Sequence, residues 1–153
     1  MPKVTLRPTI LADLPHVIGE PLPYPIRAIT ALVDDRVIGM GGIAFPPNAP
    51  AIAFVQLAPP QSSPAGGAHG VGSTAESVPE ARRYPITFHR AGLMAMALIR
   101  ASGAPLVVAT ADAGNDVAVR WLKRLGFTEA HHQPIKGKLL FVWASPTRRR
   151  LRL

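Results

Sequence analysis

Two segments of helical periodicity, residues 86–102 and 115–125, flank a strand-length apolar run at residues 105–111. Apolar residues that recur at helical spacing predict amphipathic helices, and Gly103 and Gly126 supply the stop signals after them. The run between them, Pro-Leu-Val-Val-Ala-Thr-Ala, is apolar almost throughout, which predicts a strand that is covered on both faces. A covered strand between two helices indicates a layered fold of sheet and helix.

The first of these helices has an apolar face that we expect to pack in the core. The members of this face are Leu93, Met94, Ala97, Leu98 and Ala101. Methionine is a flexible apolar side chain that fills irregular gaps, so we expect both Met94 and Met96 to be buried core fillers.

The N-terminal half of the chain is rich in strand signals. Residues 26–33 and 36–45 are apolar runs joined by Asp34-Asp35, whose turn chemistry predicts a β-hairpin. After Thr9, which is expected as a cap, apolar residues near helical spacing predict a short helix. Further strands are expected at residues 4–7, 51–58, 128–132 and 138–144. The resulting order, β-α-β-β-β-loop-α-β-α-β-β, predicts one α+β domain.

The composition excludes several classes of protein. The 153 residues are 48% hydrophobic, which is enough for one buried core. There is no cysteine, which excludes a disulfide scaffold, a thiol nucleophile and any Cys-ligated metal. His131 and His132 are adjacent and lack the helical spacing of a zinc protease, so we expect no metal site. No apolar run approaches the ~18 residues of a membrane span and no signal-peptide pattern is present, so we expect a cytoplasmic protein without membrane contact.

Two segments differ in composition from the rest of the chain. Residues 59–80 are rich in Pro, Gly, Ser and Ala, which predicts a mobile loop within a domain of residues 1–145. Residues 146–153 form a basic tail that contributes to the net charge of +8. Such arginines can neutralise nucleic-acid phosphates, but the chain lacks the interleaved aromatic residues or reading helix that nucleic-acid recognition needs. Nucleic acid is therefore not the expected partner.

The second predicted helix carries a motif with a known counterpart. Asn115 stands three residues before Ala118, and Gly126 and Phe127 follow the helix. Asparagine caps the helix, alanine allows close packing, and the Gly-Phe pair turns the chain into the next strand. This segment resembles the C-terminal motif of the GNAT N-acetyltransferase superfamily, and with the order of elements the resemblance covers nearly the whole chain. It implies a GNAT-like α+β fold, with a central mixed, mostly antiparallel sheet of six to seven strands flanked by helices.

The resemblance also implies where acetyl-CoA is held as the acyl donor. GNAT proteins place its pyrophosphate on backbone N–H groups at the start of the long helix, after a loop with the pattern Gln/Arg-x-x-Gly-x-Gly/Ala. Arg82 matches the first position, whereas Pro85 and Thr87 replace the small residues, and the proline removes one N–H donor. The neighbouring Arg83 would offset that loss by direct phosphate contact. The cofactor-binding residues that the resemblance implies are Val55, Gln56, Leu57, Arg82, Arg83, Tyr84, Ile86, Thr87 and Asn115.

No residue of the sequence is assigned to catalysis. GNAT members often use a tyrosine of the last helix as the acid, and Leu122 stands at that position. Some members use a glutamate of the strand at 51–58 as the base, and the only polar residue of this strand is Gln56. His89 and Tyr84 are the remaining candidates for base and acid, and a bound water would serve as the base in place of a side chain.

Two functions follow from the resemblance. The first is an acyl-CoA-dependent N-acyltransferase, in which an amine attacks the thioester of acetyl-CoA directly while the pantetheine arm lies between strands 51–58 and 106–111. The alternative is a non-catalytic GNAT-like structural or binding module. The sequence around Leu122 resembles that of divergent GNAT-like proteins of phages and prophages, some of which are virion components. Such a module would be associated with a virion. For either function the resemblance also implies a homodimer, because GNAT-like domains commonly pair. The sequence specifies neither the acceptor amine nor the length of the acyl group.

Overall fold

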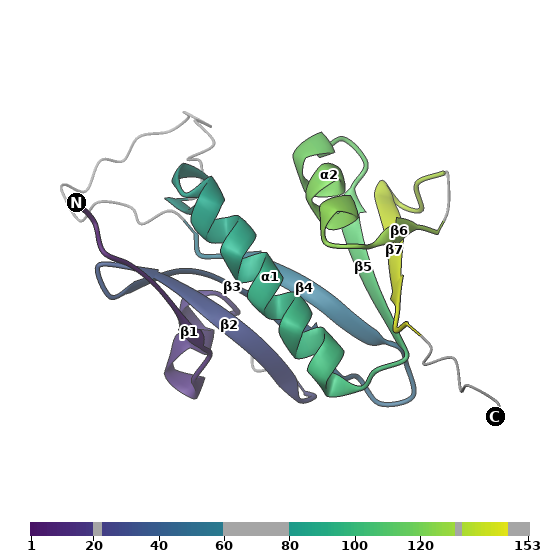
Figure 1. The fold of residues 1–153 in the computed structure, drawn as a ribbon, viewed down its shortest axis with the longest axis horizontal. Coiled ribbons are helices and arrows are strands. Elements are labelled where there is room, and N and C mark those ends of the chain that lie inside the picture. Colours follow the sequence, from purple (N-terminus) through teal and green to yellow (C-terminus); the bar gives the residue numbers. More distant parts are fainter. Residues whose placement is uncertain (20–22, 60–79, 131–132, 147–153) are drawn as a thin grey trace, which may run out of the picture.

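The computed structural model describes residues 1–19, 23–59, 80–130 and 133–146, and one mixed β-sheet runs through them. Its strand order is β1-β2-β3-β4-β5-β7-β6 (Figure 1), and among these strands every pair is antiparallel except β4–β5. The strands are β1 (Val4–Pro8), β2 (Ile26–Val33), β3 (Arg36–Ala44), β4 (Ala51–Leu57), β5 (Leu106–Asp112), β6 (Thr128–Glu129) and β7 (Lys138–Ala144). The helices are the 3₁₀ helices η1 (Leu11–His16) and η2 (Glu80–Arg83) and the α-helices α1 (Pro85–Ser102) and α2 (Asp116–Arg124). The α+β fold class and the mostly antiparallel mixed sheet are thus confirmed.

The β2–β3 hairpin has the tight turn that its sequence predicts. Asp34 and Asp35 both adopt left-handed backbone angles, with φ of 47° and 64°, as a two-residue turn that matches the twist of the strands requires. The pairing shifts by one residue next to Ala31, so Ile38 of β3 has no residue opposite it on β2. This bulge increases the local twist of the sheet, and Ile38 is buried there in a small cluster with Val33.

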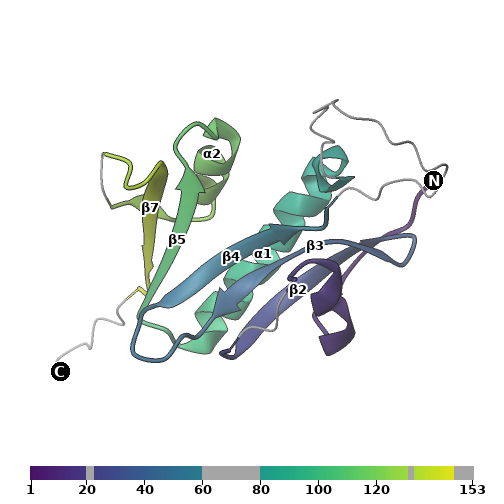
Figure 2. The ribbon, with the colours of Figure 1, turned by 180° about the vertical axis from the view of Figure 1, so that it is seen from behind.

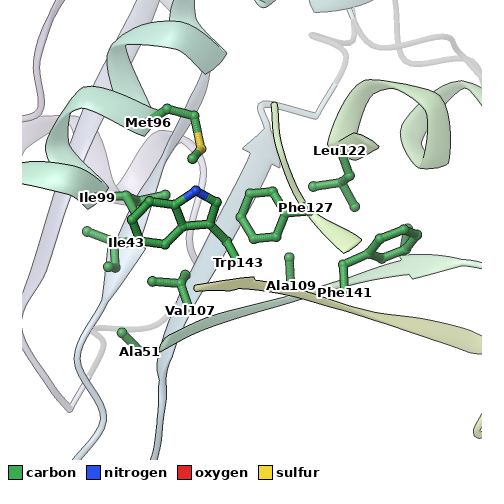
Figure 3. Close-up of a cluster of buried hydrophobic side chains, with 11 residues drawn as sticks. Ile43, Ala51, Met96, Ile99, Val107, Ala109, Leu122, Phe127, Phe141 and Trp143 are labelled. Carbon is green, nitrogen blue, oxygen red and sulfur yellow. The ribbon is translucent and has the colours of Figure 1, made fainter. Parts of the chain in front are cut away.

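Both α-helices lie on one face of the sheet, as Figure 1 and Figure 2 show from opposite sides. The main core lies beneath them and draws buried side chains from α1, α2, β5 and β7. Figure 3 shows Trp143 of β7 among these side chains, with Met96 and Ile99 of α1 on one side and Phe127 on another. The helices therefore hold β5 and β7 against the N-terminal strands.

The buried face of α1 differs from the predicted one. Gly92, Met96 and Ile99 are its buried residues, whereas Leu93 and Met94 are 49% and 37% exposed. The prediction of this face is therefore wrong, except that Met96 fills the core as expected. The true face follows the spacing i, i+4, i+7 from Gly92. A glycine gives no hydrophobic signal, so this face was not visible as an apolar stripe.

Strand β5 is covered on one face, not on both. Val107, Ala109 and Ala111 are buried beneath the helices, while the alternate residues Leu106 and Thr110 are exposed. The prediction of a doubly covered strand is wrong because α1 and α2 both pack on the same face of the sheet. An apolar run predicts a buried strand, but it does not show on which face of the sheet the helices pack.

The segment after β1 is a 3₁₀ helix that buries an acid. In place of the expected amphipathic α-helix, η1 leaves Leu11 85% exposed and buries Asp13. Thr9 does not cap it: its hydroxyl pairs with the Thr30 hydroxyl of β2 at 2.8 Å, and the Asp13 carboxylate instead accepts the Ile10 N–H at 3.0 Å. This buried carboxylate fixes η1 to β1 and β2.

Three predicted features fall partly or wholly beyond the described residues. Almost all of the expected loop at residues 59–80 lies outside them, as do residues 147–153 of the basic tail and the adjacent pair His131–His132. Within the described part, the strand expected at residues 128–132 is the two-residue β6. Among the helices of this part, none combines the length and the hydropathy that crossing a bilayer demands.

Candidate functional site

The strands β4 and β5 pair at one end and then separate. Their only register pairs are Ala51 with Val107 and Ile52 with Val108, while β4 continues to Leu57 in full register with β3. Figure 1 and Figure 2 show the two strands diverging from this end. Beyond Ile52, β4 therefore presents an edge with no strand beside it in the described part of the chain.

The polar groups at this edge can be assigned from the pairing with β3. The Ala58 N–H donates to the Ile38 carbonyl at 2.9 Å, and a Cβ placed on Gly39 would lie 3.1 Å from the Gln56 carbonyl oxygen. Even-numbered residues of β4 thus turn their N–H and C=O groups toward β3. Because these groups alternate along a strand, Val55 and Leu57 direct theirs into the gap.

The N-terminus of α1 lies at the same end of the molecule and suits an anion. In the first turn, Phe88 N–H donates to the Tyr84 carbonyl at 2.9 Å, which leaves the N–H groups of Ile86 and Thr87 without a partner within the helix. The first turn has no acidic residue, Pro85 fills the first helical position, and no side chain caps it. The dipole of this 18-residue helix favours a negative charge there.

Two arginines precede this helix end. Arg82 and Arg83 form the last residues of η2, which leads directly to α1, and both are exposed to solvent. Exposed guanidinium groups beside free N–H groups are suited to bind phosphate by charge-assisted hydrogen bonds. This end of α1 can therefore hold a phosphate group, although Pro85 contributes no donor.

A narrow apolar pocket lies between α1 and the sheet, next to the edge of β4. Four residues implied by the resemblance meet in its wall: Val55 and Leu57 from β4, and Tyr84 and Thr87 from the start of α1. Its cavity of about 30 Å³ has room for roughly two water-sized groups. No carboxylate or imidazole is among the described residues that line it. The pocket can therefore accept a small group, and it provides no strong base.

The pocket also involves residues that were not predicted. Trp121 of α2 lines it together with Phe88 and Gly92 of α1, and the rings of Phe88 and Trp121 lie 4.9 Å apart at 43°. A Cβ on Gly92 would lie 2.5 Å from Trp121 Cζ2, so only glycine leaves room for the indole. The one sequence signal was a glycine within a helical pattern, which often marks a close approach.

The other implied residues lie elsewhere. Gln56 directs its backbone groups to β3, and its side chain lies on the face of β4 away from Val55 and Leu57, since side chains alternate. The Asn115 side chain accepts the Ala118 N–H at 3.1 Å and caps α2, as its position in the motif predicts. Among the catalytic candidates only Tyr84 lines the pocket.

The two remaining catalytic positions do not face the pocket. His89 is exposed on the surface of α1, and Leu122 is 8% exposed within the core cluster beneath the helices. The described residues contain no group of three or more His, Asp or Glu side chains that could hold a metal ion.

The fold is similar to that of solved acetyltransferases. The ribosomal-protein-S18-alanine N-acetyltransferase of Escherichia coli matches with a TM-score of 0.64 at 12% identity, over 99% of this chain and 100% of that one. Nourseothricin acetyltransferase matches with a TM-score of 0.56 at 14% identity, over 94% and 99% of the two chains. The structure of yncA from Salmonella typhimurium, which contains its cofactor acetyl-CoA, matches with a TM-score of 0.57 at 12% identity, over 81% and 67%.

These similarities define the class of fold. The chain has the fold of the GNAT acetyltransferases, with the separated β4 and β5 strands beside the N-terminus of a long helix. No family model and no curated protein matches the sequence. At identities of 12–14% the likeness establishes the fold.

Proposed function

We propose that this protein is an acyl-CoA-dependent N-acyltransferase that transfers an acetyl group from acetyl-CoA to an amine. One observation carries the proposal: the unpaired edge of β4, the N-terminus of α1 and the narrow pocket adjoin one another, and Val55, Leu57, Tyr84 and Thr87 join them. An acyl-CoA has three parts with the matching chemistry, namely an anionic pyrophosphate, an amide-containing arm and a small acyl group.

The pyrophosphate is assigned to the start of α1. The N–H groups of Ile86 and Thr87 and the guanidinium groups of Arg82 and Arg83 supply donors for it, and no first-turn acid repels it. The described residues fit this group although Pro85 lacks an N–H. The arginine pair takes the place of the missing donor.

The pantetheine arm is assigned to the gap beside β4. Its amides can pair with the N–H and C=O groups of Val55 and Leu57, in the way that an added strand extends a sheet edge. The acyl end then lies beside the apolar pocket wall that Val55 and Leu57 form.

The chemistry is a direct transfer. The amine nitrogen forms a bond to the thioester carbonyl carbon, the bond from carbon to sulfur breaks, and a proton passes from the amine to the departing thiolate or to solvent. Bound acetyl-CoA would supply the activated acyl group. The chain itself supplies orientation, polarisation of the carbonyl by a β4 N–H, and exclusion of water by the apolar wall. Tyr84 is the titratable side chain of the pocket wall and is the proposed acid.

The second candidate is a binding module that has the fold without the reaction. It is favoured by Leu122, which fills the core where a tyrosine would be expected, and by a pocket wall without carboxylate or imidazole. The resemblance to phage proteins and the virion role find no support in the structures compared above. Homodimer formation finds no support in these structures either.

Calorimetric titration of acetyl-CoA tests the phosphate site. We expect micromolar binding by the wild-type chain at low salt, weaker binding at moderate salt because exposed charges are screened, and at least about tenfold weaker binding by the double variant Arg82→Ala, Arg83→Ala. The matched control is Arg27→Ala, Arg100→Ala, which removes the same charge from exposed positions on β2 and at the far end of α1. An absence of binding at millimolar acetyl-CoA, or an equal loss in both double variants, would contradict the proposal.

A kinetic assay separates the enzyme from the binding module. Release of CoA thiol can be followed with a thiol reagent without background, because the chain contains no cysteine. If Tyr84 is the acid, Tyr84→Phe lowers kcat by ~10²-fold or more and leaves acetyl-CoA affinity nearly unchanged. Tight acetyl-CoA binding without thiol release, over a panel of small amines and peptide N-termini, would favour the module.

A further inference from the structure

One face of β4, β5 and β7 is apolar although no helix in the described part of the chain covers it. The apolar run at residues 105–111 predicts a strand that is covered twice, but α1 and α2 both pack on the same face (Figure 1 and Figure 2). A sheet that turns one face to water usually carries polar side chains on that face. The apolar side chains on the opposite face of β5 therefore indicate that a further group covers them.

The pairing of the strands identifies the side chains of this face. Val107 of β5 is buried beneath the helices, so Val108 points away from them, since side chains alternate. Val108 pairs with Ile52 of β4 and with Val142 of β7, and side chains that are paired across strands share a face. We call this surface the open face, and its apolar members are Ile52, Phe54, Leu106, Val108, Leu140 and Val142.

The open face is partly exposed and carries no unpaired charge. Ile52 and Leu106 are 36% and 38% exposed, and the other four members are half-buried. Among the residues of β4, β5 and β7, the charged ones on this face are Asp112 and Lys138, which lie opposite each other and form an ion pair at 2.9 Å. A contiguous apolar surface of this kind marks a binding site for an apolar partner.

The open face begins at the rim of the gap between β4 and β5. Ile52 and Val108 form the last pair before the two strands separate, so members of the open face flank the start of the gap. On the helix face β4 lies beneath packed side chains, because Phe88 and Trp121 meet at 4.9 Å and line the pocket together with Val55. A second substrate therefore reaches a thioester in the gap from the side of the open face.

We infer that the acyl acceptor is an amine on an apolar body, an aliphatic or aromatic group without a second charge, which packs on the open face. This inference rests on the proposed function, because it assumes that the thioester lies in the gap. The amino group reaches the gap beside Ile52 and Val108, while the body covers the apolar side chains of β5 and β7. A second charge on the acceptor would lose hydration there without gaining a partner, since Asp112 and Lys138 already pair with each other.

Two amines of equal chain length test the class of acceptor. Hexylamine and 1,6-diaminohexane present the same primary amine on the same carbon chain, and the diamine adds a second ammonium group at the far end. Release of CoA thiol is measured at saturating acetyl-CoA. We expect kcat/KM for hexylamine to be at least about tenfold higher than for the diamine, because only the apolar chain is buried without a desolvated charge.

A pair of double variants tests where the apolar body lies. Leu106→Gln, Val108→Thr makes the open face polar with little change in side-chain size, and it should lower kcat/KM for hexylamine about five- to tenfold. The value for the diamine and the calorimetric affinity for acetyl-CoA should change little. The matched control is Leu93→Gln, Val117→Thr, which makes the same changes at exposed positions of α1 and α2 and should leave both amines unaffected.

Each other outcome has a distinct meaning. Equal values for the two amines, or equal losses in the two double variants, would overturn the inference and leave the proposed function in place, because thiol is still released. Binding of acetyl-CoA without thiol release from either amine would also overturn the inference. If acetyl-CoA does not bind, the proposed function fails and the inference fails with it.

Sedimentation velocity tests whether a second copy of the chain covers the open face instead. A second copy seated there would cover the rim of the gap and exclude the acceptor. We expect the wild type and the variant Leu106→Gln, Val108→Thr to have the same oligomeric state. A wild-type dimer that this variant converts to a monomer would overturn the inference.

Discussion

The buried carboxylate of Asp13 should make the stability of this protein depend on pH in the acid range. Asp13 is 3% exposed and accepts hydrogen bonds from both terminal nitrogens of Arg7, at 2.6 and 2.8 Å. It also accepts the Ile10 N–H and the Thr30 hydroxyl, each at 3.0 Å. The hydrogen bonds from Arg7 lower the pKa of Asp13 to about 2, with smaller help from Ile10 and Thr30 and against the effect of burial, which raises it.

The sign and size of the effect follow from this pKa. The pKa of Asp13 in the folded state lies below the ordinary value of 3.8. The ionised carboxylate therefore stabilises the fold fully when the pH is above 3.8, and this contribution is lost as the pH falls through about 2. At 1.36 kcal/mol for each unit, the shift corresponds to about 2 kcal/mol at neutral pH. Roughly 1 kcal/mol of it should be gone by pH 3.

Urea unfolding of the wild type and of Asp13→Asn between pH 7 and pH 3 measures this contribution. At pH 7 the variant should have a free energy of unfolding about 2–3 kcal/mol lower, because a charged hydrogen-bond network loses its acceptor. The difference should shrink by roughly 1 kcal/mol at pH 3. A difference that stays constant from pH 7 to pH 3 would show that folding does not lower the pKa of Asp13.

An exposed acid supplies the control for Asp13. Asp112 pairs with Lys138 at 2.9 Å, but its side chain is 71% exposed. Exposed pairs contribute little, so Asp112→Asn should change the free energy of unfolding by less than about 0.5 kcal/mol at either pH. A loss as large as that of Asp13→Asn would mean that burial is not what matters at Asp13.

Two further substitutions test the packing around the candidate site. Gly92→Ala gains up to about 1 kcal/mol of helix propensity, but its Cβ would lie 2.5 Å from Trp121 Cζ2. The overpacking cost of about 1–3 kcal/mol should therefore exceed the gain and lower the Tm by several degrees. A raised Tm would show that the indole moves freely. Asn115→Ala removes the acceptor of the Ala118 N–H and should lower the free energy of unfolding by about 1 kcal/mol. Asn115→Ser keeps a cap and should lower it much less, in thermal or urea unfolding. Equal losses in the two variants would contradict the capping role.

The order of the elements could be predicted because its signals are local. The turn at Asp34 and Asp35, the stop at Gly103 and the cap at Asn115 each depend on a few neighbouring residues, and each is present in the structure. The motif that ends at Phe127 added the class of fold. The separation of β4 from β5 was expected only through that resemblance, since neither strand carries a local signal for it.

The features that the sequence did not predict depend on contacts between elements that are distant in the chain. The buried face of α1 includes Gly92, where the indole of Trp121 approaches, and the glycine itself is the single local sequence signal of this contact. Asp13 lies in the segment expected as a short helix, and no sequence signal indicated that Arg7 and Thr30 from two strands would hydrogen-bond to it. The pocket wall could be predicted in part. The loop pattern before α1 indicates Tyr84 and Thr87, whereas no sequence pattern indicates Trp121.

The proposed function requires that the edge of β4 and the first turn of α1 together bind acyl-CoA. Hydrogen exchange of individual backbone amides, measured by NMR with and without acetyl-CoA, tests it most directly. We expect the amides of Val55, Leu57, Ile86 and Thr87 to become protected on binding, while that of Gln56, already directed to β3, changes little. Binding that protects amides elsewhere and leaves Val55 and Leu57 exchanging as before would show that acetyl-CoA does not bind at the edge of β4.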